Sequence, residues 1–161
     1  MSYKITSNIK KAFQNIRKDI RRTYSIEEME AIGEAASEMV RVRTRLGYGV
    51  KKPNTKRERL KKLSEEYIET RKDFGALSEF TTPARSNLTR TGQLLESIAV
   101  LEVTEGNVEI GPQGARDDNM TNEKLAEHVS VARPFISLSN LEVKKLVRFI
   151  EKNIIKKVFR R

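Results

Sequence analysis

Two helix-starting signals bracket a central segment with the hydrophobic pattern of strands, and this order limits the fold more than any other feature. Ser25 is followed three residues later by Glu28, and Ser139 by Glu142. A serine and glutamate at this spacing form a capping box, in which each side chain accepts a hydrogen bond from the other residue's backbone N–H. Between them, apolar residues in 98–110 recur with a period of two, as in a hairpin. The sequence therefore predicts an α+β fold.

Apolar residues at helical spacing extend from both capping boxes. The first helix starts after Ser25 and runs to about Leu46, and Gly47 ends it because glycine adopts a left-handed cap without strain. An amphipathic helix with a basic outer face is predicted before it, over residues 5–21. The last helix starts after Ser139, and its apolar stripe is formed by Leu141, Leu146, Phe149, Ile150, Ile154 and Val158.

Shorter elements are predicted between these helices. The hairpin pairs residues 98–103 with 108–110 around a turn at Glu105-Gly106-Asn107. Residues 131–138 are predicted to form an edge strand, because Pro134 cannot donate to a ladder. Three short helices are predicted: 63–72 capped by Ser64, 91–98 capped by Thr91, and one from Thr121 to about Val129.

The remaining segments lack periodicity and contain Gly, Pro, Ser, Thr and Asn, so residues 47–59, 75–90 and 112–120 are predicted to be loops. Long loops in a small domain are usually functional or become ordered only with a partner. The predicted organisation is a helical region at 1–46, a loop-rich connection with a short helix at 47–90, and an α+β core at 91–161. Together they form one globular domain, with N-terminal helices, a small antiparallel sheet and a C-terminal helix packed on the sheet.

The charge is unevenly distributed along the chain. The formal net charge is +10. Residues 1–25 and 140–161 each carry six excess positive charges, whereas residues 91–130 carry six excess negative charges. This pattern has three interpretations: contact with nucleic acid, pairing of acidic and basic faces between subunits, or ordinary solvated helix faces.

Catalytic machinery is not apparent. The chain has no cysteine and a single histidine, His128, which excludes thiolate chemistry and disfavours a metal site. A lone imidazole needs a nucleophile or carboxylate beside it to act as a general base, and no such pair is apparent. The sequence therefore predicts no enzyme, no cofactor and no metal, with His128 structural or interfacial. No apolar run is long enough to span a membrane.

A sequence-specific nucleic-acid reader is also disfavoured. Such readers present base-edge contacts or stacking aromatics, and aromatic residues make up only 6% of the chain. The aromatic residues of the terminal helices lie on or beside apolar stripes. Non-specific contact with DNA stays open, because basic helices can contact phosphate.

Several strings in a fixed order resemble the tail-completion and neck proteins of tailed bacteriophages, including the Mu-type virion-morphogenesis family. From about Leu60 onward, the strings are Leu63-Ser64 with Tyr67 and Arg71, then Leu88-Thr89, Thr91-Gly92-Gln93-Leu94-Leu95-Glu96-Ser97-Ile98, Val108-Glu109-Ile110-Gly111, Leu125-Ala126-Glu127-His128 and Ala132-Arg133-Pro134-Phe135-Ile136. One departure is Val129-Ser130, where the family often has an aromatic residue followed by glycine.

The resemblance implies a structural virion protein at the head–tail junction. Its partners would be other neck and tail proteins and copies of itself in a ring, commonly a hexamer, around the DNA channel. Its location would be the virion, and the host cytoplasm during assembly. Two alternatives remain: a tail terminator that caps the tail tube, and a basic nucleic-acid-binding protein. An uncharacterised hydrolase ranks third.

The interface candidates come from the resembling strings and the basic C-terminal helix: Arg133, Pro134, Phe135, Thr91, Gly92, His128, Lys156 and Lys157. Arg133 offers five donors that can clamp backbone carbonyls or a carboxylate at a joint. Pro134 would stiffen the edge, and Phe135 would anchor it in the core. The alternative is that this motif only fixes a strand-to-helix corner.

Overall fold

The computed structural model describes residues 24–51, 56–73, 77–104, 106–116 and 120–155, and these residues form the expected α+β fold. The predicted helix over 5–21 lies outside them. The elements in chain order are α2 (Ile26–Arg45), β1 (Tyr48–Lys51), β2 (Lys56–Arg59), α3 (Glu65–Asp73), α4 (Gln93–Glu96), β3 (Ile98–Thr104), β4 (Asn107–Pro112), α5 (Asn122–Ala132), α6 (Asn140–Ile150) and a π-helical turn, η1 (Glu151–Ile155).

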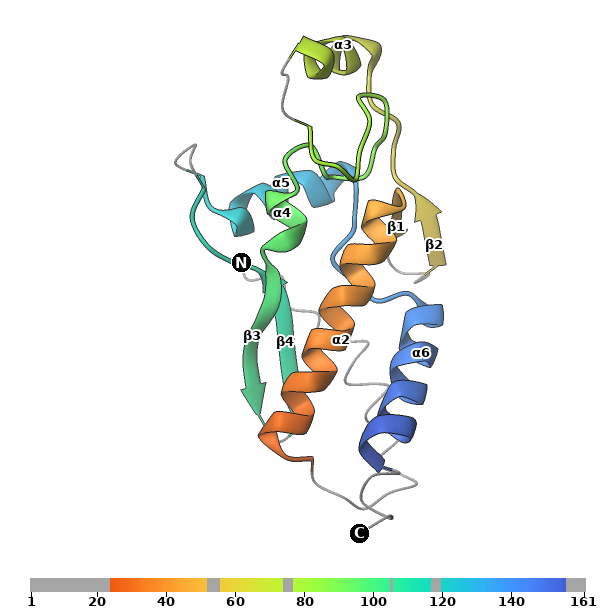
Figure 1. The fold of residues 1–161 in the computed structure, drawn as a ribbon, viewed down its shortest axis with the longest axis vertical. Helices are drawn as coiled ribbons and strands as arrows, with labels where there is room; N and C mark the ends of the chain where they lie inside the picture. Colours follow the sequence, from red (N-terminus) through yellow and green to blue (C-terminus); the bar gives the residue numbers. More distant parts are fainter. Residues whose placement is uncertain (1–23, 52–55, 74–76, 105, 117–119, 156–161) are drawn as a thin grey trace.

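Helix α2 is the centre of the described fold. It runs between the antiparallel β3–β4 hairpin and α6, while α4 and α5 lie at the end of the hairpin that is nearer to α3 (Figure 1). The antiparallel β1–β2 hairpin lies beside the C-terminal end of α2. One apolar core joins α2, α4, α5, α6 and the β3–β4 hairpin, and its buried residues include Met29, Ile32, Ile98, Phe135 and Leu146.

Close packing of α2 on the β3–β4 hairpin depends on Gly33. A Cβ atom at this position would lie 2.6 Å from Val108 Cγ2 and 2.7 Å from Val100 Cγ2, too close for any side chain. Glycine thus lets the helix backbone approach both strands. The C-terminal helix was expected to pack on the sheet, but the helix that lies closest along both strands is α2, and α6 packs beside α2.

The predicted helix starts are confirmed by their hydrogen bonds. Ser25 Oγ accepts from Glu28 N at 3.3 Å, and Ser25 N donates to the Glu28 carboxylate at 3.0 Å. A second capping box joins Ser139 and Glu142. At the end of α2, Gly47 has a φ of +83°, the left-handed conformation expected there. Local sequence signals therefore define the starts of α2 and α6 and the end of α2.

Caps were also predicted for three short helices, and two of them are confirmed. Ser64 Oγ accepts from Tyr67 N at 3.3 Å, and Thr121 Oγ1 accepts from Lys124 N at 3.3 Å. The third prediction was wrong, because Thr91 does not cap α4. The N-cap is Gly92, with a φ of +83° and no side-chain capping bond.

The segment 47–59, predicted to be a loop, contains strands β1 and β2. Tyr48 faces Arg59 and Val50 faces Arg57 across the ladder. The guanidinium carbons of Arg57 and Arg59 lie 5.2 and 5.5 Å from the centre of the Tyr48 ring, so cation–π contacts support the pairing. Strand β2 was missed because it has no apolar residue from which a period of two could be recognised.

The predicted edge strand over 131–138 was also wrong. Its first two residues end α5, and the segment 133–139 is irregular. It keeps one strand-like bond, from Val50 N to Pro134 O at 2.9 Å. Gly49 permits this approach, because a Cβ atom there would lie 2.2 Å from Pro134 O.

We therefore expect Gly49→Ala to separate the β1–β2 hairpin from Pro134 and to destabilise the protein by about 2–3 kcal/mol, from overpacking and the strained hydrogen bond. Urea denaturation followed by circular dichroism measures the loss. Lys56→Ala, at an exposed position of β2, serves as the control and should change stability by less than about 0.5 kcal/mol. Equal stability of the two variants would contradict the packing described.

Candidate functional site

A buried ion pair positions the segment that carries the interface candidates. The Arg43 side chain is 1% exposed and lies 2.6 Å from Glu142 Oε2. It also donates to Ser137 O at 2.7 Å, to Phe135 O, and to Tyr48 O at 3.4 Å. Burial lowers the pKa of Arg43, and Glu142 opposes this by favouring the charged form. One guanidinium thus joins α2, β1, α6 and the irregular segment 133–139.

Glu142 has two structural roles in this network. Its Oε2 atom accepts from the backbone N–H of Ser139 at 2.7 Å and from Ser139 Oγ at 2.7 Å, as well as from Arg43. The capping residue of α6 is therefore also the counter-ion of the buried arginine. This pair was not predicted from the sequence, although Arg43 stands at a helical interval after Val40 on the buried stripe of α2.

A first groove, of about 540 Å³, lies between the β1–β2 hairpin and residues 130–137. Pro134 and Phe135 are among its lining residues. Phe135 is fully buried and belongs to the apolar core, as expected of an anchor. Val131 lines the same groove and is 84% exposed, so an apolar side chain stands open to solvent at its edge.

A second groove, of about 660 Å³, lies among α3, the segment 85–91, α4 and α5. Thr91 and Arg133 both line it, although they belong to different strings of the sequence. The resembling strings 88–98 and 132–136 therefore meet at one surface. Gly92 is buried at the start of α4, and neither it nor the exposed His128 of α5 lines either groove. Lys156 and Lys157 lie outside the described residues.

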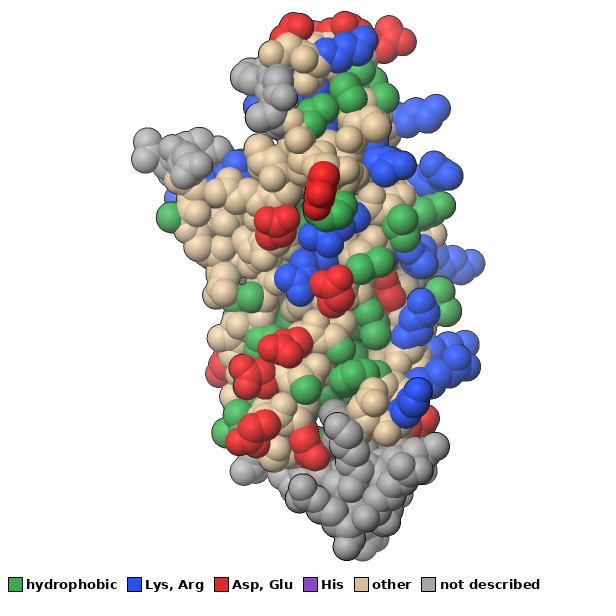
Figure 2. All heavy atoms as spheres, in the orientation of Figure 1, with side chains coloured by type: hydrophobic (Ala, Val, Ile, Leu, Met, Phe, Trp, Pro, Cys, Tyr) green, Lys and Arg blue, Asp and Glu red, His purple; other side chains and the backbone are tan. Residues whose placement is uncertain are grey.

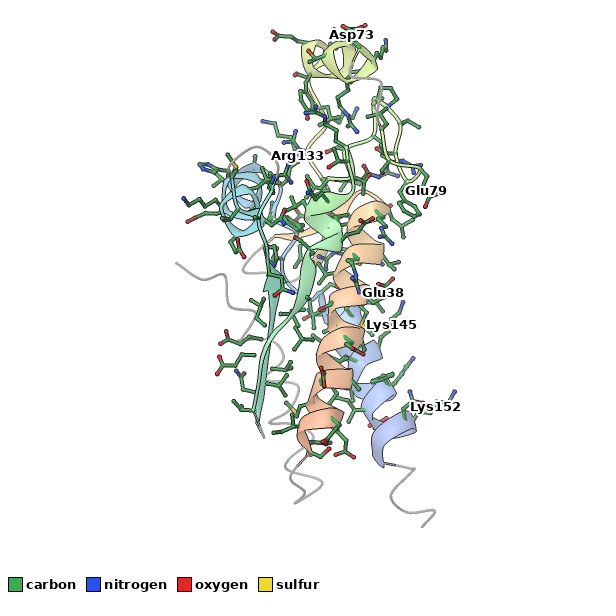
Figure 3. The ribbon with its side chains drawn as sticks, turned by 60° about the vertical axis from the view of Figure 1, so that its left-hand side comes forward. Glu38, Asp73, Glu79, Arg133, Lys145 and Lys152 are labelled. Atoms are coloured by element: carbon green, nitrogen blue, oxygen red, sulfur yellow. The ribbon has the colours of Figure 1, made fainter. Side chains whose placement is uncertain are left out.

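Arg133 stands between the two grooves and lines both. Its Nε donates to Lys61 O at 3.3 Å and to Ser86 Oγ at 3.3 Å, and its Nη2 lies 3.5 Å from Lys62 O. Figure 3 places Arg133 where the end of α5 meets the chain that leads to α3. The five donors of Arg133 were expected to bind backbone carbonyls or a carboxylate at a joint. The side chain does bind backbone carbonyls, and these belong to the same chain.

The loop before α4 is held by its own polar network. Asn87 is fully buried; its Nδ2 donates to Arg45 O at 3.0 Å and to Phe80 O at 2.9 Å. Its Oδ1 accepts from Thr81 Oγ1 at 2.9 Å and from Thr89 Oγ1 at 2.6 Å. The described part of this loop, residues 77–90, is irregular as predicted. Its internal bonds mean that no partner is needed to explain its conformation.

Charges are segregated on the face shown in Figure 2. Lysines and arginines follow one edge, over β2 and α6, while glutamates gather over the β3–β4 hairpin and α2. The exposed basic residues of α6 and η1 are Lys144, Lys145, Arg148 and Lys152. The exposed acidic residues of α2 include Glu27, Glu30, Glu34 and Glu38. Lys145 and Lys152 project away from the helix in Figure 3.

Other kinds of site were sought within the described part of the chain. These residues contain no group of three or more His, Asp or Glu side chains placed to hold a metal ion. None of their helices is long and apolar enough to cross a membrane. Comparison with models of protein families, with characterised proteins and with solved structures finds no match. The two grooves and the charged edges are therefore the candidate functional surfaces of the described residues.

Proposed function

We propose that the chain is a structural protein of the head–tail junction of a tailed bacteriophage, which works by docking to other virion proteins and to copies of itself. The observation that carries this proposal is the meeting of the resembling strings 88–98 and 132–136 at one surface. Thr91 and Arg133, the exposed and half-buried members of these strings, line the same groove. A shared surface built from both strings is what a docking protein needs.

The segregation of charge supports the same proposal. A basic edge over α6 and β2 and an acidic region over α2 and the β3–β4 hairpin suit head-to-tail contacts between copies. Such contacts close into a ring when the rotation between neighbours is right. A tail terminator would use the same chemistry at the end of the tail tube, so the position in the particle separates these two functions.

A nucleic-acid-binding function is favoured by one observation. Lys145 and Arg148 of α6 and Lys152 of η1 are exposed, and they follow one another at intervals of three and four residues, which forms a basic row. A phosphate-binding row loses affinity steeply as salt rises, whereas assembly that rests on apolar burial does not. Duplex binding by the isolated chain at several salt concentrations therefore separates this function from docking.

Reversing two charges of this row tests its role. We expect Lys145→Glu with Lys152→Glu to slow incorporation of the chain into particles by roughly tenfold, because charges at the rim of an interface mainly set encounter rate and orientation. Incorporation is measured by quantifying the chain in purified particles over time. Tight, salt-sensitive duplex binding by the unaltered chain, abolished in the variant, would favour the nucleic-acid function instead.

Arg133→Ala tests the surface between the grooves. Its three contacts are to partly exposed groups, so the loss of stability should be about 1–2 kcal/mol and the fold should remain. We expect heads and tails to accumulate unjoined in its presence, as counted by electron microscopy. Lys124→Ala, which removes an exposed cation of α5 outside both grooves, is the control. An insoluble or unfolded Arg133→Ala chain would mean that the residue only fixes the corner between α5 and α6.

A further inference from the structure

The second groove has an unusual set of side chains. Five arginines line it: Arg71, Arg85, Arg90, Arg116 and Arg133. No aspartate, glutamate or lysine is among the described residues around it. We call this the arginine groove. Five guanidinium groups along one groove favour an anionic occupant there, because opposite charges attract.

Arg71 is the buried member of the set. It is 4% exposed, and it donates to Arg85 O at 3.0 Å and to Thr81 Oγ1 at 3.3 Å. Its buried Nε atom has no hydrogen-bond partner within the described part of the chain. Burial lowers the pKa of Arg71, the nearby Tyr67 raises it, and Arg90 lowers it again. The fold therefore holds a buried cation beside a second cation, with a donor left over.

The lining of the groove also contains aliphatic side chains. They come from the segment before α3, the loop before α4, α4 and α5: Leu63, Leu88, Leu94, Leu125 and Val129. Leu88 has a φ of +57°, uncommon for leucine, so the surrounding network holds it in place. Tyr67 is the single aromatic residue among the described lining residues and is 40% exposed. Nucleobases stack on aromatic side chains, and the groove offers only Tyr67 among its described lining residues. Aliphatic side chains of a partner, by contrast, pack well against the leucines and the valine.

We propose that the arginine groove binds an extended acidic segment of a partner protein, in which carboxylates alternate with aliphatic side chains. Alternate side chains of an extended chain point to opposite sides, so carboxylates can face the arginines while aliphatic groups pack on the leucines. Arginine pairs with carboxylate through two parallel hydrogen bonds. A volume of about 660 Å³ has room for a few residues. This inference rests on the proposed docking function and names the chemistry of its partner.

The test measures binding of a fluorescent peptide that alternates Glu and Leu to the full chain by fluorescence anisotropy. Arg85 and Arg90 are exposed, so Arg85→Glu with Arg90→Glu should keep the fold. We expect this double variant to bind roughly 100-fold more weakly, since two charged pairs become repulsive. Lys145→Glu with Lys152→Glu makes the same change of net charge outside the groove and should bind as the unaltered chain does.

Three further probes define which occupant the groove takes. A Glu–Ser peptide should bind roughly tenfold more weakly than Glu–Leu because it lacks the aliphatic contact, and a Lys–Leu peptide should not bind. Oligothymidylate should not displace the Glu–Leu peptide. The proposal is overturned if the Glu–Leu peptide fails to bind, if both double variants bind equally, or if oligothymidylate displaces it. If the Glu–Leu peptide does not bind but the chain is found in the neck of particles, only the inference about the arginine groove is wrong. The proposed function fails separately, when the chain is not found in the neck.

Discussion

Glu142→Ala is expected to destabilise the protein by about 3–5 kcal/mol, the cost of removing one partner from a buried ion pair. The variant leaves Arg43 charged at 1% exposure, and it removes the capping carboxylate of α6. Urea denaturation measures the loss. Glu69→Ala, which breaks an exposed pair with Lys72, is the control and should cost less than about 1 kcal/mol.

A double-mutant cycle separates the ion pair from the cap. Arg43→Met with Glu142→Gln should be less destabilising than the sum of the single changes, because each single change strands a buried polar group that the double change removes or neutralises. Strict additivity would mean that Arg43 and Glu142 act independently. A Glu142→Ala variant as stable as Glu69→Ala would contradict the role given to the pair.

Phe135→Ala is expected to cost about 3–5 kcal/mol, because it empties a fully buried aromatic position in the core. Thermal unfolding checks this, and Leu141→Ala is the control, since Leu141 is 48% exposed on α6. Although Phe135 was an interface candidate, its buried ring indicates a role in the core. Normal stability with loss of docking would return Phe135 to the interface.

Local sequence signals predicted the starts of α2, α3, α5 and α6 and the β3–β4 hairpin well, because caps and hydrophobic periods are encoded within a few residues. They failed at β2, whose four residues are all charged and are held by pairing with β1 and by Tyr48. They failed again at 133–139, where bonds from the distant Arg43 determine an irregular course. Both errors come from contacts between segments that the sequence does not reveal.

The candidate site was predicted in part. The resemblance drew attention to Thr91 and Arg133, and the structure places both in one groove. The five arginines of that groove could not be grouped from the sequence, because they lie in four separate segments, from α3 to the residue that follows α5. The network around Asn87 is what brings the loop arginines beside Arg71, and polar networks of this kind have no sequence period.

The most direct test of the central claim is to locate the chain in purified tailed particles that contain it, by electron microscopy with an antibody raised against the chain. The proposed function predicts label at the junction of head and tail, and a ring of density there that accommodates copies of the described fold. Label confined to the tail tube, label inside the head with the genome, or absence of the chain from complete particles would contradict it.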